Sequence, residues 1–289
     1  MPLTLPGSLS PTRVASFTDC PLAFRLRAID RIPEPPSAHT TRGTLVHTVL
    51  ERLIWEHSAD ERTPQAAAEE LERAWAELQS SEEYARLGLD PEAGAAFHLD
   101  ASRLIANYFT LEDPTKVDAV GVELCLEAEI DGIRLRGIID RLDLDAAGEL
   151  VVVDYKTGRA PPARYEKAKL AGVHLYALLC EQALGRVPVE VRLLHLREPL
   201  SITATPSPQT LRGQRTRTVA VWRAIERACQ REDFVPRPSP LCDYCSYHEW
   251  CPAFGGSPPA IAPLAIAPPA IAPLAIAPLA IAPLAIAPT

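Results

Sequence analysis

The chain has 289 residues, of which 47% are hydrophobic and 23% charged, so it has apolar material for one large domain or two small ones, and generic disorder of the body is excluded. The formal net charge of −8 argues against a basic protein that coats nucleic acid, but it allows an enzyme with a local acidic metal site. The N-terminus has no basic segment followed by an apolar run, and no apolar stretch of about 18 residues lacks proline. We therefore expect a cytoplasmic protein with no membrane span and no secretory signal.

Apolar residues recur at helical spacing through the first part of the chain, and the pattern then changes to that of strands. Helices are predicted over residues 11–30, 43–58, 64–80 and 92–110, with a proline-rich loop at 33–36 after the first. Strands are predicted over residues 120–130, 133–144 and 149–155, joined by turns at 131–132 and 145–148. A helical part followed by a meander of strands suggests an α/β sheet with an added helical lobe.

The second half of the chain alternates helix and strand and then changes composition. A helix is predicted over 162–184, strands over 189–196 and 200–205, an arginine-rich helix over 208–230, and a proline- and cysteine-rich cap over 236–257. From residue 258 the unit Ala-Ile-Ala-Pro recurs six times. Proline at every fifth position blocks both helix and central strand, so residues 258–289 are predicted to form an extended, disordered tail outside the fold.

Two aspartates and a lysine follow apolar strands in the middle of the chain. Asp140 lies late in one strand, Asp154 ends the next, and Lys156 comes two residues later. Residues two apart on a strand face the same side, so Asp154 and Lys156 point together, and the hairpin brings Asp140 beside Asp154. Paired carboxylates attract Mg²⁺ or Mn²⁺, which activates water, and a lysine stabilises the charge of a phosphoryl transition state. The pattern predicts phosphodiester hydrolysis; the alternative is an exposed hairpin with solvated charges.

A histidine on an early helix could complete the metal site. Gly43, His47 and Glu51 follow each other at intervals of four residues, which places them on one helical face. His47 would act as a neutral imidazole ligand, Gly43 would permit close approach, and Glu51 could hold the imidazole ring. Glu123, on the strand before Asp140, is a candidate for an acid outside the first shell of ligands. The alternative is a structural histidine with no ligand role.

Three of the seven cysteines crowd into ten residues as Cys242, Cys245 and Cys251, a spacing typical of a metal or cluster site. A fourth thiolate is required, and Cys20 precedes a proline as Cys251 does. The odd number of cysteines and the expected cytoplasmic location argue against a disulfide framework. The remaining cysteines, at 125, 180 and 229, lie in apolar patterns and are predicted to be buried. Four thiolates suit either Zn²⁺ or a [4Fe–4S] cluster, and the chemistry alone does not separate the two.

The order of these motifs resembles the RecB-type nucleases of the PD-(D/E)xK superfamily over about residues 8 to 253. Gly-x-x-x-His on a helix, Ile-Asp on a strand, Asp-Tyr-Lys-Thr-Gly and a following helix with a late tyrosine, Tyr176, carry the resemblance. It implies a restriction-endonuclease-like mixed sheet flanked by helices, with an N-terminal helical lobe and a C-terminal cysteine-rich cap. The nuclease domain would span 1–257, with a helical insertion at about 58–115.

The resemblance also implies roles for particular residues. His47, Asp140 and Asp154 would be metal ligands together with the backbone carbonyl of Tyr155, and Lys156 would be the catalytic lysine. The family often has glutamine four residues before the late tyrosine, where this chain has Gly172, and His174 is a possible substitute. In an iron–sulfur branch of the family, which includes AddB-like and CRISPR-adaptation nucleases, one early and three late cysteines bind a [4Fe–4S] cluster. Cys20, Cys242, Cys245 and Cys251 match that arrangement.

We therefore interpret the chain as a Mg²⁺- or Mn²⁺-dependent DNA exonuclease in recombination or repair, with a structural [4Fe–4S] cluster. The alternatives are a CRISPR-adaptation nuclease that trims spacer precursors and a catalytically inactive module that binds DNA ends. Single-stranded or end-bearing DNA is the expected partner, and Arg212, Arg215 and Arg223 on the arginine-rich helix are candidate phosphate contacts, unless they only form a solvated face. None of the four lysines follows a glycine, so the chain lacks the ATP-binding loop of a helicase and could serve a separate helicase subunit.

Overall fold

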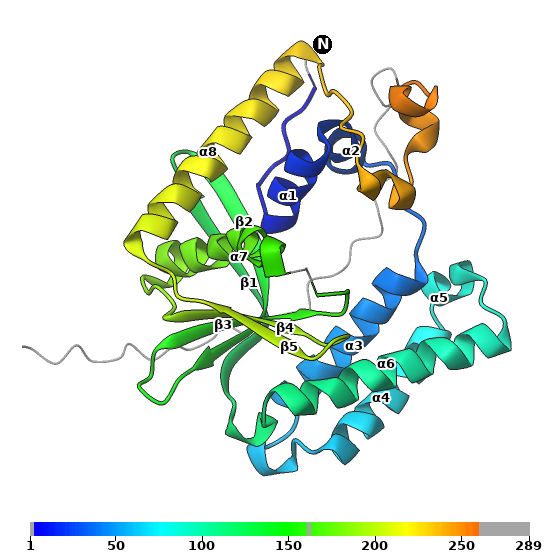
Figure 1. Cartoon of the computed structure of the whole chain (residues 1–289), viewed down its shortest axis with the longest axis vertical. Helices are drawn as coiled ribbons and strands as arrows, with labels where there is room; N and C mark the ends of the chain where they lie inside the picture. The colour runs from blue at the N-terminus through cyan, green and yellow to red at the C-terminus, as the bar shows by residue number, and fades with distance from the viewer. Residues whose placement is uncertain (1–2, 161–162, 260–289) are drawn as a thin grey trace, which may run out of the picture.

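The computed structural model describes residues 3–160 and 163–259, and within the second range it describes side chains from residue 172 onward. Five strands form one mixed sheet in the order β1-β2-β3-β4-β5, with helices on both sides of it (Figure 1). The strands are β1 (Asp118–Ile130), β2 (Ile133–Leu144), β3 (Leu150–Lys156), β4 (Glu190–His195) and β5 (Leu200–Ala204). This arrangement confirms the predicted restriction-endonuclease-like α/β fold.

The sheet is mixed because one of its connections is a helix and the others are turns. β1, β2 and β3 pair antiparallel in chain order, and β4 pairs antiparallel with β5. β3 and β4 pair in parallel, which requires a long crossover connection, and α7 (Ala163–Leu184) supplies it. β3 is buried on both faces, which explains its run of apolar residues from Leu150 to Val153.

The helices outside this crossover lie in three groups along the chain. The first group is α1 (Pro11–Asp19), α2 (Pro21–Phe24) and the π-helical turn η1 (Arg25–Ile29). The second is α3 (Ala38–Trp55), η2 (Ala59–Glu61), α4 (Pro64–Gln79), α5 (Glu82–Leu87), α6 (Pro91–Leu111) and η3 (Pro114–Lys116). The third is α8 (Pro208–Arg231) and the short turns η4 (Pro240–Tyr244), η5 (His248–Trp250) and η6 (Pro252–Phe254).

The structure corrects two helix boundaries. The helix predicted over 11–30 is interrupted at Cys20, which is extended (φ −153°, ψ 108°) because Pro21 begins a new helix. The helix predicted over 43–58 begins earlier, at Ala38, because Ser37 and Thr40 form a capping box with each other's side chains and backbone. The short helix α5 was not predicted.

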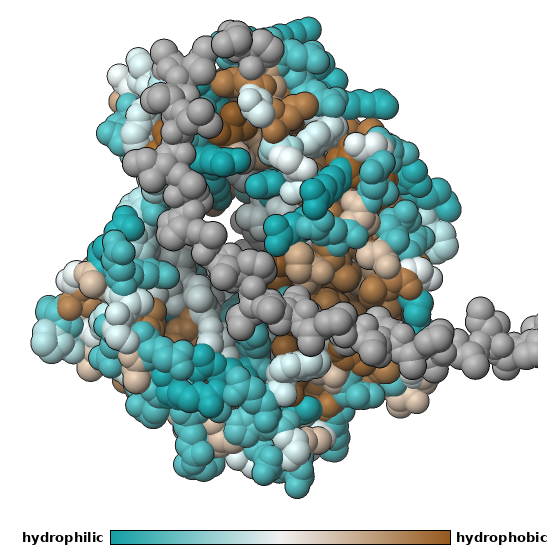
Figure 2. Space-filling view, turned by 180° about the vertical axis from the view of Figure 1, so that it is seen from behind, coloured by the Kyte–Doolittle hydropathy of each residue, from teal (hydrophilic) through white to brown (hydrophobic). Residues whose placement is uncertain are grey.

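The sheet separates two apolar cores. The first core packs α1, α2, α7 and α8 against one face and includes Leu178 and Ile225. The second core packs α3, α4 and α6 against the other and includes Leu50 and Leu104. The outer surface of the α4–α6 lobe is largely hydrophilic in Figure 2. Within residues 3–160 and 163–259, no helix combines the length and apolar composition that a membrane crossing requires. The predicted tail lies outside the described residues from residue 260 on.

Candidate functional site

Helix α3 carries His47 to the sheet. One face of α3 packs into the second core through residues that include Val46 and Val49, which fixes the rotation of the helix. Gly43 lies one turn before His47, and a Cβ atom at Gly43 would lie 3.1 Å from the Oγ1 atom of Thr157. Thr157 follows Lys156 directly, so glycine at 43 allows the helix to approach the end of β3 closely.

Two carboxylates meet the imidazole of His47. Its Nδ1 atom lies 3.6 Å from Asp140 Oδ2 and 3.8 Å from Glu123 Oε1. One ligand atom from each of the three residues lies within 4.8 Å of the others, and all three side chains are partly exposed. Glu123, predicted to lie outside the first shell of ligands, therefore stands among the groups closest to His47.

The backbone around Glu123 and Asp140 departs from regular strand geometry. The pairs Val122–Arg141 and Leu124–Ile139 place Glu123 across from Asp140, and Glu123 has φ 43°, in the left-handed region that non-glycine residues rarely adopt.

The side-chain alternation of β2 changes at the same place. Ile139 belongs to the first core, whereas Arg141 donates hydrogen bonds to Tyr108 and Tyr155 of the second. Residues two apart on a regular strand share a face, so the alternation changes by one residue at Asp140. Strand irregularities of this kind re-aim side chains next to active sites.

The end of β3 brings the remaining predicted residues to the same place. The β2–β3 register pairs Arg141 with Val153, which puts Asp154 across from Asp140. Asp154 is buried and forms an ion pair with the ammonium group of Lys156. The backbone N–H of Tyr155 donates a 2.7 Å hydrogen bond to Asp140 Oδ2, and the Tyr155 ring packs edge-on against His47 with centroids 5.9 Å apart.

The crowding of acids changes their protonation. Burial, followed by the charge of Asp154, raises the pKa of Asp140 to about 7. Burial lowers the pKa of His47, but Glu123, Asp140 and Asp154 outweigh that effect and raise it. Burial likewise lowers the pKa of Lys156, and the charges of Asp154 and Asp140 raise it overall, so that Lys156 remains an ammonium group.

The donor set fits a hard divalent cation. It offers one imidazole nitrogen and carboxylate oxygens from neighbouring strands, which are ligands that Mg²⁺ and especially Mn²⁺ accept. Burial and the charge of Asp154 raise the pKa of Asp140, and a bound cation would offset the repulsion between these two carboxylates.

Two further predicted residues lie near the centre. Burial and the charge of Glu123 raise the pKa of Glu51, which places the Glu51 carboxylate within electrostatic reach of Glu123. Burial and the charges of Asp154, Asp140 and Glu123 raise the pKa of Tyr176, whose ring also packs over Gly137. At Gly172 a Cβ atom would meet nothing within 4 Å, and His174 is half-buried.

The four predicted cysteines lie together between α1–α2 and the C-terminal turns. Cys20, Cys242, Cys245 and Cys251 line one hollow of about 180 Å³. Burial raises the pKa of Cys245, and the other three thiols add to the increase. The backbone N–H groups of Arg237 and Ser239 each donate to a cysteine sulfur at 3.4 Å, the first to Cys20 and the second to Cys242.

Of the three cysteines predicted to be buried, Cys180 and Cys229 are buried and Cys125 is not. The prediction for Cys125 was wrong because Leu124 and Leu126 of β1 turn toward the first core. Cys125 therefore points away from that core, where its sulfur accepts a 3.2 Å hydrogen bond from Arg136 Nε.

The three candidate arginines of α8 lie away from the group formed by His47, Glu123 and Asp140. Arg215 forms an ion pair with Asp131 at the β1–β2 turn, at 2.6 Å, and Arg212 and Arg223 are exposed. Asp131 is nine residues from Asp140 along the hairpin, a separation of about 30 Å at ~3.3 Å per residue. The structure does not bring these three arginines to the His47 group.

Sequence reasoning missed Arg141. This arginine is completely buried directly after Asp140 and bonds to Glu112, Asp143, Tyr108 and Tyr155. An arginine between two aspartates in an apolar strand was the available signal, because a buried arginine requires partners.

A family model and several known proteins match most of the chain. The model of the PD-(D/E)XK nuclease superfamily matches residues 8–252. The Gene 69 protein of Mycobacterium phage L5 is 27% identical over 297 aligned positions, which cover 85% of this chain and 96% of the phage protein. The Gene 69 protein of Mycobacterium phage D29 is 26% identical over 274 positions, with the same coverage of both chains. A solved structure from Eubacterium rectale, provisionally assigned as an exonuclease, has a TM-score of 0.48 and 12% identity, and covers 83% of this chain and 88% of its own.

Proposed function

The chain belongs to the PD-(D/E)XK nuclease superfamily, and from that premise we propose that it is a RecB-type, metal-dependent DNA exonuclease that acts in recombination or repair. The observation that carries the proposal is the approach of His47, Glu123 and Asp140 to one another next to the Asp154–Lys156 pair. His47, Asp140 and Asp154 are the proposed metal ligands, with the carbonyl of Tyr155 and with Glu123 in reach. Lys156 is the proposed catalytic lysine.

Each side chain has a defined part in the proposed reaction. A bound Mg²⁺ or Mn²⁺ would acidify a water molecule and polarise a phosphoryl oxygen. The ammonium group of Lys156, which forms an ion pair with buried Asp154, would orient that water and neutralise charge on the phosphoryl group. The Tyr155 N–H holds one oxygen of Asp140 in a fixed direction. Glu51 and Tyr176 would support this group from α3 and α7.

We also propose that the four cysteines bind a structural [4Fe–4S] cluster. Their common hollow and the two N–H···S hydrogen bonds support this, because backbone donors stabilise cluster thiolates. Zn²⁺ is the alternative occupant, because four thiolates also suit a tetrahedral zinc site.

Single-stranded or end-bearing DNA is the proposed substrate, and a separate helicase subunit is the proposed partner. The arginines of α8 remain candidates for phosphate contacts remote from the cleaved bond. CRISPR adaptation and inactive end-binding are the competing functions that the following experiment addresses.

The experiment compares cleavage of linear and covalently closed DNA, single- and double-stranded, by anaerobically purified full-length protein with Mn²⁺, Mg²⁺ or EDTA. We expect metal-dependent release of nucleotides from linear DNA alone. Lys156→Ala should lower the rate by about 10²–10³-fold, because it removes a charge that acts on the transition state.

The matched control is Lys116→Ala, which removes an exposed lysine paired with Asp113 and should leave the rate unchanged. Absence of metal-dependent cleavage by the wild type would rule out the nuclease and leave the end-binding module. Cleavage confined to spacer-precursor ends would favour CRISPR adaptation over repair.

A further inference from the structure

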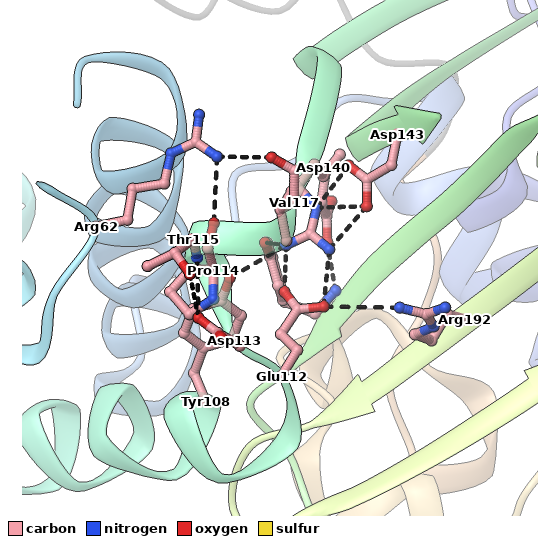
Figure 3. Close-up of polar contacts among 12 residues, drawn as sticks. Arg62, Tyr108, Glu112, Asp113, Pro114, Thr115, Val117, Asp140, Asp143 and Arg192 are labelled. Carbon is pink, nitrogen blue, oxygen red and sulfur yellow. Dashed lines mark hydrogen bonds and ion pairs between the residues drawn. The ribbon is translucent and has the colours of Figure 1, made fainter. Parts of the chain in front are cut away.

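Behind the candidate metal centre, a buried arginine connects the helical lobe to the two strands that carry Asp140 and Asp154. Figure 3 shows the side chains of Glu112, Asp143 and Arg192 converging there. Arg141 is fully buried, and its Nε and Nη2 atoms donate to Asp143 at 2.8 and 2.9 Å. Nη2 also donates to Glu112 Oε2 at 2.9 Å, and Nη1 donates to Glu112 Oε1. Nη1 donates in addition to the Tyr155 hydroxyl, at 2.7 Å. We call Arg141, Glu112, Asp143 and Tyr155 the arginine hub.

The charges of the hub are balanced within a buried region. Glu112 and Asp143 offset Arg141, and Arg192 of β4 lies 3.7 Å from Glu112. A buried ion pair is weak evidence for stability, because desolvation costs about as much as the attraction returns. The more useful property of such a network is that it fixes one arrangement of the groups it joins.

Tyr155 passes that arrangement to the metal centre. Its hydroxyl is held by Arg141, its ring lies against His47, and its backbone N–H donates to Asp140. It also lies between Asp154 and Lys156 in the chain, and Arg141 directly follows Asp140. A shift of the Arg141 guanidinium would therefore move residues that are directly next to the proposed ligands, on β2 beside Asp140 and on β3 beside Asp154.

The helical lobe supplies the other end of the hub. Glu112 caps the C-terminus of α6. The turn that follows is held by Arg62, whose Nη1 atom donates to the carbonyls of Pro114 and Val117 at 3.2 and 2.8 Å (Figure 3). The segment that follows Glu112 is thereby tied to Arg62, which lies between η2 and α4.

We propose that the arginine hub is a positioning device, through which Arg141 and Glu112 hold Tyr155 and Asp140 in the arrangement that binds the metal ion. This inference rests on the proposed function. It assigns the buried α6–β2–β3 contact a role in metal affinity in addition to folding.

The test compares two variants, each of which removes one tyrosine hydroxyl that accepts a hydrogen bond from Arg141 Nη1. Tyr155→Phe removes the hydroxyl that accepts from Arg141 Nη1 at 2.7 Å and keeps the ring on His47 and the backbone N–H. Tyr108→Phe removes another buried hydroxyl that accepts from the same atom at 3.2 Å. Within the described residues, Tyr108 forms no hydrogen bond or ion pair with His47, Asp140, Asp154 or Lys156, so it is the matched control.

The Kd for Mn²⁺ is measured on each full-length variant, with the midpoint of thermal unfolding measured in parallel. We expect Tyr155→Phe to raise the Kd about 10- to 100-fold, the usual effect of removing an outer-shell partner. Raised Mn²⁺ should restore part of its cleavage rate. Tyr108→Phe should lower the unfolding midpoint similarly and leave the Kd near that of the wild type.

Equal Kd values for Tyr155→Phe and wild type would overturn the proposal, and so would equal increases in both variants, which would indicate general loosening. Arg141→Lys keeps the positive charge but removes the several directed hydrogen bonds of the guanidinium, and it should raise the Kd for Mn²⁺ as Tyr155→Phe does. A wild type that neither binds Mn²⁺ nor cleaves DNA would instead disprove the proposed function.

Discussion

The backbone N–H of Tyr155 and the Oδ2 atom of Asp140 form a hydrogen bond of 2.7 Å across two neighbouring strands. The same oxygen lies 3.6 Å from His47 Nδ1, so the bond occupies one of its lone pairs and leaves another free to accept a metal ion. The position of β3 relative to β2 therefore sets the direction of a ligand atom. Metal affinity is for this reason a more direct measure of the site than cleavage alone.

Glu123→Gln should weaken Mn²⁺ binding by about 10-fold or more, because it removes a charge whose oxygen lies 3.8 Å from His47 Nδ1. Calorimetric titration with Mn²⁺ measures the effect. Glu127→Gln is the control on the same strand, where the carboxylate pairs with exposed Arg134. An unchanged Kd in Glu123→Gln would exclude Glu123 from the metal centre.

Gly43→Ala should reduce cleavage by about 10-fold, because its Cβ would press on Thr157 and shift the residue after Lys156. Alanine also favours a helix over glycine by about 1 kcal/mol. Gly213→Ala, in α8 with open space around the new Cβ, should gain that stability without loss of cleavage. Rates and unfolding free energies of both variants measure the two effects, and equal cleavage in both would contradict the close approach of α3.

Cys245→Ser should lose the iron content and the visible absorption of anaerobically prepared protein. Residues 20 and 242 belong to opposite ends of the chain, so the cluster closes a very long loop. By analogy with a long disulfide loop, worth about 4 kcal/mol, the unfolding midpoint should fall by about 10 °C.

Cys125→Ser removes a thiol outside the hollow and should retain the iron and the stability. Zinc in place of iron in anaerobic wild-type protein would contradict the cluster assignment.

Glu112→Gln should lower the free energy of unfolding at pH 7 by about 3–5 kcal/mol, because it leaves Arg141 short of a buried partner. Burial raises the pKa of Glu112, but its bonds to Arg141 outweigh burial and lower it overall. A lowered folded-state pKa gives stability that is present above the unfolded value of about 4.3 and is lost as the pH falls through the folded pKa. The difference between wild type and variant should therefore shrink below about pH 4.

Denaturant titrations at pH 7 and pH 3 measure this difference. Asp143, whose pKa is raised by burial, is present in both proteins, so its effect largely cancels in the comparison. Glu77→Gln is the control, since its exposed pair with Arg52 should contribute under about 1 kcal/mol at either pH. A pH-independent difference for Glu112→Gln would contradict the assigned ion pair.

Much of the fold was predictable because apolar residues recur at regular spacing in the strands and helices that pack into the two cores. The strand predicted over 133–144 has the observed bounds, since apolar residues alternate along it and Gly132 (φ 76°) fixes its turn. The interruption at Cys20 was harder to predict, because Pro21 can begin a helix as well as interrupt one.

The sequence predicted the two aspartates and the lysine at the strand ends, and it predicted the other residues of the candidate site less well. Asp140, Asp154 and Lys156 could be related by the period of a hairpin, which is a local rule. The position of Glu123 depends on its own left-handed backbone conformation and on the altered side-chain alternation of β2 at Asp140. The sequence of β1 has no pattern that predicts either feature. Arg141 was missed because its main partner, Glu112, comes from another element 29 residues away.

His47 is carried by a helix of one apolar core, and Tyr176 by a helix of the other. The candidate centre therefore exists only while both halves of the molecule are folded and seated on the same sheet. Opening of the α3 half would remove His47 from the acids of the strands, and opening of the other half would remove the supporting ring of Tyr176. A bound ion should therefore couple the two halves into a single cooperative unfolding unit.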